Sequence, residues 1–248
     1  MKTVDAYDTI FKDKKTIMVI MAHPDDLEVF CGGTVARLLA DGKRVISVKI
    51  TTGDRGSKDR VVGLDDLAKQ RLAEDAKAMA VFGIPPEDSV NLLLHDGEVD
   101  NSLQTIGKIA YQIRKFKPEL IITTNPDSVI IRHSPGTNWV NHRDHRHAAE
   151  SALDAAYPYS RDRSFFPEHF NDPGILPTHC VEFLIADSWT GLDEVMIDVN
   201  EYKSTVKRAM LCHGSQVNEG YVDNSISFFT THGGVSGAYE KFRHVIAD

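Results

Sequence analysis

The sequence predicts an α/β fold in which a mostly parallel sheet carries helices on both of its faces. Two observations support this prediction. Short, unbroken apolar runs, typical of strands buried on both sides, recur through the first half of the 248 residues. Each run is followed by a longer segment whose apolar residues recur at helical spacing, so that strands and helices alternate. Hydrophobic residues make up 42% of the chain, an ordinary share for a globular protein with a large core.

Four strands and three helices are expected in the first half. The strands are residues 17–21, 45–50, 90–94 and 120–124, and the helices between them are residues 32–40, 64–82 and 103–116. Gly42 and Gly83 follow the first two helices, where glycine commonly ends a helix, and Pro118 prevents the third from continuing. The alternation implies right-handed crossovers between parallel strands.

The second half has longer irregular segments, and we expect it to belong to the same single domain, residues 1–248. Residues 125–141 lack a clear period and predict a loop, whereas residues 142–157 predict a helix. Residues 158–178 are rich in Pro and aromatic residues, and form either a lid or wall of a site or a surface loop with its own packed aromatic cluster. Further strands are expected at 181–186 and 195–199, and helices at 202–212 and 238–246.

The charge and the cysteine content argue against several classes of protein. The net charge of −8 does not suit binding to nucleic acid or to an anionic membrane, because both attract basic surfaces. Three widely spaced cysteines without a Cys-x-x-Cys pair indicate neither a disulfide framework nor a thiolate zinc site. No apolar run approaches about 18 residues and residues 1–15 lack a signal-peptide pattern, so we expect a cytoplasmic protein without a membrane span.

A polar cluster follows the first predicted strand directly. Pro24 ends that strand, and His23, Asp25 and Asp26 stand beside it. The cluster therefore lies at the carboxyl end of a strand, where open α/β sheets bind ligands. The alternative is a helix N-cap, a position that Asp favours, although a cap needs one Asp and not a His with two.

A second polar cluster, residues 142–145, follows the fourth predicted strand. His142 and His145 are three residues apart, so they share one face at the start of a helix, and Asp144 lies between them. With eleven histidines in the chain, such a pair occurs easily by chance. However, the fourth strand often neighbours the first in a doubly wound sheet, which would bring the two clusters together.

Together the clusters could form a metal site and supply catalytic groups. His23, Asp26 and His145 would give two nitrogen ligands, one carboxylate and an open position, the pattern of catalytic zinc, although Fe²⁺ accepts the same ligands. Asp25 could accept a proton from water at the metal. His142 could polarise a carbonyl or protonate a leaving amine, with Asp144 fixing its tautomer. This combination is suited to the hydrolysis of an amide.

These residues resemble the paired motif of the PIG-L/LmbE-like N-acetylglucosaminyl deacetylases. The matching motifs are residues 22–28 and 142–145, and the similarity extends from about residue 16 to residue 216. It includes Arg71 and Glu74 on one predicted helix, the stretch that runs from the second motif to residues 166–168, and the late segment from Lys207 to residues 213–216.

The resemblance implies a Rossmann-like three-layer sandwich with one zinc ion, and removal of the N-acetyl group from an N-acetylglucosamine unit. It implies zinc on His23, Asp26 and His145, with Asp25 as the general base. His142 would be the acid or the group that polarises the carbonyl.

Further roles follow from the same resemblance. Asp144 would stand behind His142. Arg71 would bind a sugar hydroxyl or a charged aglycone group, or else pair with Glu74. The loop with Asp54 and Arg55 would line the site, whereas His213 would contact the sugar or the end of a helix.

Other functions remain open at this point. A related zinc amidase could act on a different amide, such as a thiol conjugate, with residues 125–141 setting the difference. A sugar-binding protein without catalysis is a second alternative, but it would need neither Asp25 nor His142. The expected partner is a small amino-sugar substrate, and the resemblance leaves a homo-oligomer possible because family members often associate.

Overall fold

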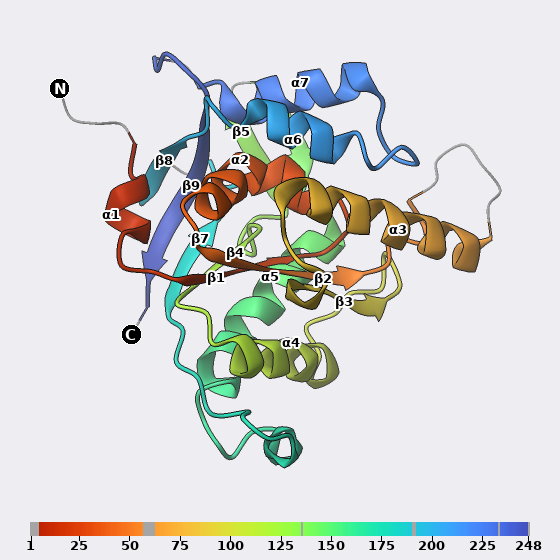
Figure 1. Ribbon diagram of the computed structural model, residues 1–248, viewed down its shortest axis with the longest axis vertical. Helices are drawn as coiled ribbons and strands as arrows, with labels where there is room; N and C mark the ends of the chain where they lie inside the picture. Colours follow the sequence, from red (N-terminus) through yellow and green to blue (C-terminus); the bar gives the residue numbers. More distant parts are fainter. Residues whose placement is uncertain (1–4, 57–62, 135, 190–191, 233, 248) are drawn as a thin grey trace.

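A seven-stranded sheet forms the centre of the computed structural model, which describes residues 5–56, 63–134, 136–189, 192–232 and 234–247 (Figure 1). Its strands lie in the order β3 (Ser89–Leu94), β2 (Arg44–Thr51), β1 (Thr16–Met21), β4 (Leu120–Thr123), β7 (Glu182–Ile185), β9 (Tyr239–Ile246) and β8 (Glu194–Asp198). The pairs from β3 to β7 are parallel, and β9 is antiparallel to both of its neighbours. The predicted α/β fold with a mostly parallel sheet is therefore confirmed.

Helices cover both faces of this sheet (Figure 1). One face carries α2 (Asp26–Ala40), α3 (Leu64–Phe82), α6 (Lys203–Met210) and α7 (Glu219–Thr230), and the other carries α4 (Leu103–Phe116) and α5 (Arg143–Asp154). A short helix, α1 (Tyr7–Phe11), packs near β8. Alternate residues of β1 point into the two apolar clusters, Val19 into one and Ile20 into the other, which explains the unbroken apolar run.

The helix after β1 is longer than the sequence predicts. It begins at Asp26 rather than residue 32, and Cys31, with φ of −151°, interrupts it. At this interruption the N–H groups of Gly33 and Thr34 donate to the buried carboxylate of Glu240, each at 2.7 Å. The predicted start thus corresponds to the second part of the helix.

Two predictions for the irregular half are wrong. Residues 125–141 contain a hairpin of β5 (Ile130–Ser134) and β6 (Thr137–Val140), with Gly136 at a φ of +85° between the strands. Residues 238–246 are not a helix, because β9 inserts between β7 and β8 and completes the sheet. The helix α7 was not predicted at all.

The aromatic segment 158–178 is not a wall of the site, and that prediction is also wrong. The segment includes a short 3₁₀ helix (Pro167–Asn171) and packs against α4, where the ring of Phe166 covers Gly107. Arg114 of α4 is fully buried. Its guanidinium donates to the carbonyl oxygens of Tyr159, Ser160, Asp162, Phe165 and Phe166. The alternative of a packed surface loop is the correct one.

Arg114→Ala is expected to lower the free energy of unfolding by about 3 kcal/mol or more. Several carbonyl groups would lose this donor, and each buried acceptor left unsatisfied costs about 1–3 kcal/mol. Urea denaturation monitored by circular dichroism measures the change. Lys115→Ala, at the exposed neighbouring position, is the control and should differ from wild type by no more than about 0.5 kcal/mol. Equal unfolding midpoints for the two variants would contradict the anchoring role.

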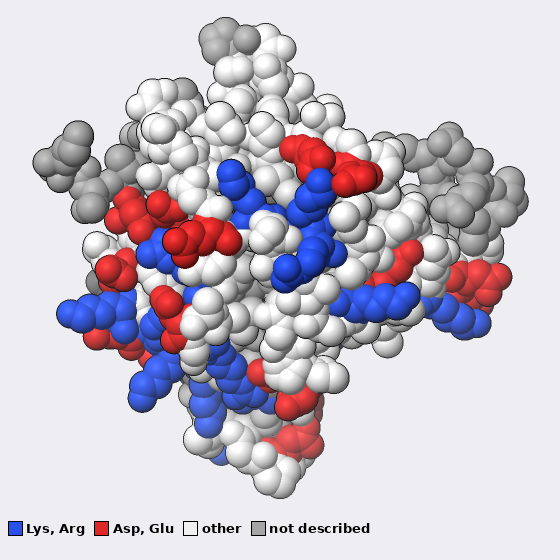
Figure 2. Space-filling view, turned by 45° about the horizontal axis from the view of Figure 1, so that its top comes forward, with Lys and Arg blue, Asp and Glu red and all other residues white. Residues whose placement is uncertain are grey.

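Charges of both signs are mixed on the visible surface. On the face shown in Figure 2, Lys and Arg side chains lie among Asp and Glu side chains and do not merge into one basic surface. Among the helices of the described residues, none combines the length and the apolar character needed to cross a membrane.

Candidate metal and catalytic site

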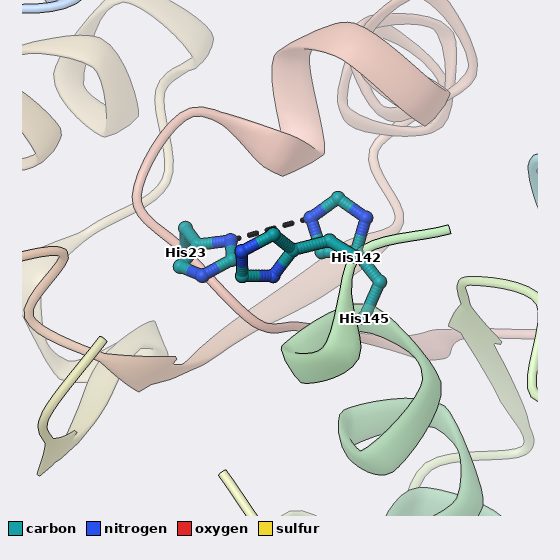
Figure 3. A group of neighbouring side chains, drawn as sticks. All are labelled: His23, His142 and His145. Atoms are coloured by element: carbon teal, nitrogen blue, oxygen red, sulfur yellow. Dashed lines mark hydrogen bonds between the residues drawn. The ribbon is translucent and has the colours of Figure 1, made fainter. Parts of the chain in front are cut away.

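The two polar clusters meet at the carboxyl ends of β1 and β4. These strands are hydrogen-bonded neighbours, as predicted, with residue pairs such as Ile17 and Leu120. The chain leaves β1 into α2 on one face and reaches α5 on the other face after β4, so the two clusters lie where the strand order reverses. His23 reaches this point from the β1 side, and His142 and His145 reach it from the start of α5 (Figure 3).

The three predicted metal ligands approach one another closely. His23 Nδ1 lies 3.2 Å from His145 Nε2 and 3.3 Å from Asp26 Oδ2, and His145 Nε2 lies 3.2 Å from Asp26 Oδ1. Tetrahedral zinc with ligands at about 2.0–2.1 Å separates its ligand atoms by about 3.3 Å. The spacing and the donor set of two imidazoles and one carboxylate therefore fit zinc. A nitrogen atom of His142 also lies within 4.8 Å of nitrogen atoms of the other two histidines.

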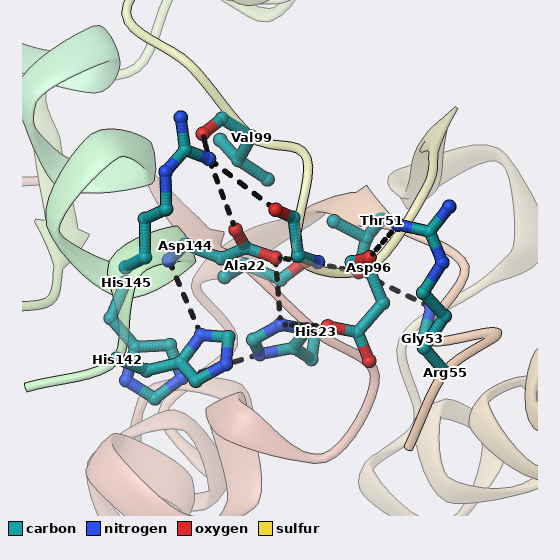
Figure 4. Close-up of polar contacts among 12 residues, drawn as sticks. Ala22, His23, Thr51, Gly53, Arg55, Asp96, Val99, His142, Asp144 and His145 are labelled. Atoms are coloured by element: carbon teal, nitrogen blue, oxygen red, sulfur yellow. Dashed lines mark hydrogen bonds and ion pairs between the residues drawn. The ribbon is translucent and has the colours of Figure 1, made fainter. Parts of the chain in front are cut away.

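The other ring nitrogen of His23 faces two carboxylates (Figure 4). Its Nε2 lies 3.2 Å from Asp96 Oδ1 and 3.3 Å from Asp144 Oδ2, and the Gly97 N–H donates to the same Asp144 oxygen at 2.6 Å. Burial acts to lower the pKa of His23, but Asp26, Asp144 and Asp96 raise it well above its ordinary value. Carboxylates behind a ligating imidazole fix the orientation of its ring.

Asp144 therefore occupies a different place from the predicted one. The resemblance puts its carboxylate behind His142, but in the structure the carboxylate lies against His23. Only the backbone N–H of Asp144 reaches His142, where it donates to Nδ1 at 3.2 Å. Burial acts to raise the pKa of Asp144, whereas hydrogen bonds from His23 and from the Gly97 N–H lower it overall.

His142 is an exposed side chain next to His23 and His145. Because its Nδ1 accepts a hydrogen bond, the proton of the neutral ring is on Nε2. Burial of part of the ring, together with the nearby His23 and His145, lowers the pKa of His142. The structure thus offers a neutral N–H donor at this position.

Asp25 is held in an unusual conformation next to the predicted metal ligands. Its φ of +102° lies in the left-handed region, which costs energy for any residue except glycine and often marks a functional site. The residue occupies the N-cap position of α2, but its side chain accepts no capping hydrogen bond, so the alternative of a helix cap is wrong. Burial raises the pKa of Asp25 to about 6, against the opposite effect of the nearby Arg71.

Arg71 holds Asp25, and this contact was not predicted. Its Nη2 lies 3.1 Å from Asp25 Oδ2, and its guanidinium also donates to the carbonyl oxygens of Pro24 and Gly53, at 2.5 and 3.0 Å. A Cβ atom at Gly53 would collide with this guanidinium. With only 3% of its surface exposed, Arg71 has no free face for a sugar.

The predicted alternative of an ion pair between Arg71 and Glu74 is also not observed. Glu74 instead accepts from the N–H and the hydroxyl of Ser215, at 3.0 and 2.6 Å. Arg71 thus pairs with Asp25 and not with Glu74, and its burial argues against direct contact with a sugar.

Asp96 is the site residue that sequence reasoning missed. It is 8% exposed and stands between His95 and Gly97, just after β3. A polar residue at the carboxyl end of a predicted strand is the same signal that identified the other two clusters. The same signal therefore marks Asp96 in the sequence.

Asp54 and Arg55 support the Asp96 loop. Asp54 is buried and accepts from His95 Nδ1 at 2.6 Å and from the Asp96 N–H at 2.8 Å. Arg55 donates to the Asp96 carbonyl oxygen at 2.8 Å and pairs with Glu98 at 2.5 Å. The contacts of both residues are therefore with the loop that carries Asp96.

His213 lies beneath the site. It is fully buried, its Nε2 is 3.0 Å from Glu28 Oε1, and its Nδ1 has no hydrogen-bond partner among the described residues. It lines a cavity together with Asp25 and Asp26, so it borders the site without reaching the surface.

The chain is similar to known proteins over most of its length. Diacetylchitobiose deacetylase of Thermococcus kodakarensis is 26% identical over 213 residues, which cover 84% of this chain and 73% of that protein. The 1D-myo-inositol 2-acetamido-2-deoxy-alpha-D-glucopyranoside deacetylase of Rhodococcus erythropolis is 24% identical, with 82% of this chain and 81% of that protein covered.

Similarity also extends to solved structures and to a family profile. N,N'-diacetylchitobiose deacetylase of Pyrococcus horikoshii has a TM-score of 0.80 at 22% identity, over 95% of this chain and 85% of that one, which shows a shared fold. The profile described as GlcNAc-PI de-N-acetylase (PIG-L) matches residues 18–156, more than half of the sequence. This chain therefore belongs to the PIG-L family.

Proposed function

We propose that this chain is a zinc-dependent hydrolase that removes the N-acetyl group from a substrate containing N-acetylglucosamine. The observation that carries the proposal is the approach of His23, Asp26 and His145 to within 3.3 Å of one another, beside an Asp25 that Arg71 holds. The relatives named above, which are deacetylases of acetylated amino sugars, support the same reaction.

Each polar group has a role in this reaction. When bound, zinc supplies a Lewis acid that polarises the amide carbonyl and acidifies water. Asp25 accepts a proton from the attacking water and passes it to the nitrogen that leaves as the amine. Arg71 keeps the Asp25 carboxylate in place for both transfers.

His142 acts as the donor to the carbonyl oxygen. Of the two roles expected for it, acid or polarising group, the second is favoured because a ring with a lowered pKa is neutral near pH 7. Its Nε2–H then donates to the oxygen on which negative charge develops. Asp144 and Asp96 orient His23 through its Nε2, so they are positioning residues.

Acetate release tests the proposal. The zinc-loaded protein is offered N-acetylglucosaminides that differ only in the aglycone, together with one N-acetylated thiol conjugate. We expect acetate from at least one glucosaminide, and loss of release after chelation that added zinc reverses. Release from the thiol conjugate alone would favour the alternative zinc amidase, and no release from any compound would contradict the proposal.

Arg71→Met is expected to lower kcat by about tenfold or more while KM changes little. The guanidinium touches the catalytic Asp25 and is too buried to touch substrate, so its loss disturbs the position of the base and not binding. Steady-state kinetics of the wild type and the variant, at the same zinc content, measures both constants. Arg208→Met, an exposed position on α6, is the matched control. A rise in KM with normal kcat would return Arg71 to substrate binding.

A further inference from the structure

A cavity of about 190 Å³ opens directly beside the candidate metal ligands. Its polar lining consists of residues of the site and their neighbours, Asp25, Asp26, His145 and His213. The rest of its wall is apolar or aromatic and comes from α2, α6, α7 and the segment between the last two: Val29, Phe30, Met210, Val217, Tyr221 and Phe229. Amide hydrolysis as proposed above needs only room for a methyl group on the acyl side.

An aromatic path leads from the metal ligands into this cavity. The ring of Phe30 packs edge-on against His145, with 5.5 Å between the ring centroids, and against Phe229 of α7 at 5.4 Å. Met210 and Val217 belong to the small apolar cluster formed where α6 and α7 meet. Tyr221, which is 52% exposed, lies at its outer side. The wall is therefore continuous from the reacting centre to the surface.

A second polar region, around Asp96, lies on the other side of His23. His23 Nδ1 faces Asp26 and His145, which border the cavity, whereas its Nε2 faces Asp96. The carbonyl oxygen of Asp96 accepts from Arg55 (Figure 4). Arg55 also pairs with Glu98. A sugar with many hydroxyl groups suits the polar side, because buried polar groups need partners, and an apolar chain suits the other side. With the sugar on the polar side, the cavity would receive the acyl side of the scissile amide.

We propose that this cavity is an acyl-chain channel, and that the enzyme removes medium-chain N-acyl groups from an amino sugar in addition to acetyl. The inference rests on the proposed amide hydrolysis and names the acyl group of its substrate. Water adds to the carbonyl carbon, the carbon–nitrogen bond breaks, and the products are the fatty carboxylate and the protonated amine. The volume of the cavity, about 190 Å³, far exceeds what one water molecule or one methyl group needs, so the cavity has room for several methylene groups.

Chain-length selectivity is the first test. Zinc-loaded protein is offered glucosamine carrying acetyl, butyryl, hexanoyl or octanoyl on its nitrogen. Each buried methylene strengthens binding about fourfold, so kcat/KM should rise at least tenfold from acetyl to hexanoyl. Acetyl release without release of the longer groups would overturn the channel and leave the proposed function intact. Failure on every amide, acetyl included, would overturn the proposed function, and the binding measurement below would then decide the channel.

Variants of the wall test where the chain lies. Val217→Phe fills the channel and should lower the hexanoyl-to-acetyl ratio of kcat/KM at least tenfold, whereas Phe229→Leu enlarges it and should move the optimum to a longer chain. Leu103→Phe, at an exposed position of α4 on the other face of the sheet, is the matched control and should leave the ratio unchanged. Ratios that stay the same in both wall variants would overturn the proposal. Shifts in opposite directions would support it, because a folding defect lowers the activity on both substrates and leaves their ratio unchanged.

Binding of octanoate provides a measurement that does not depend on turnover. By calorimetry, wild type should bind octanoate at least tenfold more tightly than acetate, with a negative heat-capacity change, and Val217→Phe should lose this preference. An octyl glycoside of N-acetylglucosamine tests the competing occupant. If the octyl aglycone gains affinity through Val217 and the octanoyl group does not, the channel holds the aglycone and the proposal is wrong.

Discussion

Asp25→Asn is expected to keep the fold and the bound zinc and to lose about 10²–10⁴ in kcat, equivalent to about 3–5 kcal/mol of transition-state stabilisation. The amide has the same shape as the carboxylate, and its oxygen can still accept from Arg71 Nη2, which lies 3.1 Å from the carboxylate in wild type. What the amide cannot do at neutral pH is accept the proton of the attacking water.

Single-turnover acetate release, zinc content and thermal unfolding together measure this expectation. Asp66→Asn, an exposed position in the first turn of α3, is the matched control and should behave as wild type. A kcat within tenfold of wild type at full zinc content would show that another group takes the proton. Asp96, whose carboxylate also lies at the site, would then be the next candidate.

The first half of the fold is predictable because its signals are local. Residues 64–82 and 103–116 form helices with the predicted bounds, since Gly83 in the left-handed conformation ends α3 and Pro118 follows α4. All four apolar runs form strands. Those of β1, β2 and β4 are buried along nearly their whole length, whereas β3 lies at the edge of the sheet and leaves Leu93 exposed. The apolar pattern and the Gly and Pro residues at the helix ends were sufficient to predict these elements.

The second half is less predictable because its strands depend on distant partners. Strand β9 pairs Ile246 with Glu182 and Tyr239 with Asp198, residues that the local pattern cannot reveal. Its inward-facing Glu240 also breaks the expected alternation of apolar and polar residues, because the partners of that carboxylate are backbone N–H groups of α2. Local propensity was overridden by tertiary pairing.

The candidate site also combines residues that the sequence predicts with contacts that it does not predict. The proposed ligands His23, Asp26 and His145 could be predicted from the sequence, because motif spacing and strand order bring them together. The supporting contacts were not accessible. Which carboxylate faces which imidazole, and that Arg71 reaches Asp25 and not Glu74, depend on how α3 and the Asp96 loop pack over β1.

Asp26→Asn is expected to weaken zinc binding without removing a catalytic group. At low zinc concentration the variant should therefore lose nearly all activity. A neutral amide oxygen is a poorer zinc ligand than a carboxylate, and Asp26 is the only acid among the three proposed ligands. Zinc affinity should fall more than about 100-fold, beyond the usual effect of a residue that only orients a ligand. Competition with a fluorescent zinc chelator measures the affinity directly, without reference to turnover.

Adding zinc separates the two neighbouring aspartates. Excess zinc should partly restore Asp26→Asn, because the fold and Asp25 remain intact, and should not restore Asp25→Asn, because its zinc is already bound. His145→Ala removes a ligand without replacement and should bind zinc more weakly than Asp26→Asn. If excess zinc restores Asp25→Asn and leaves Asp26→Asn inactive, the two roles are exchanged. That exchange would mean that the strained turn at Asp25, and not the first residue of α2, carries the metal ligand.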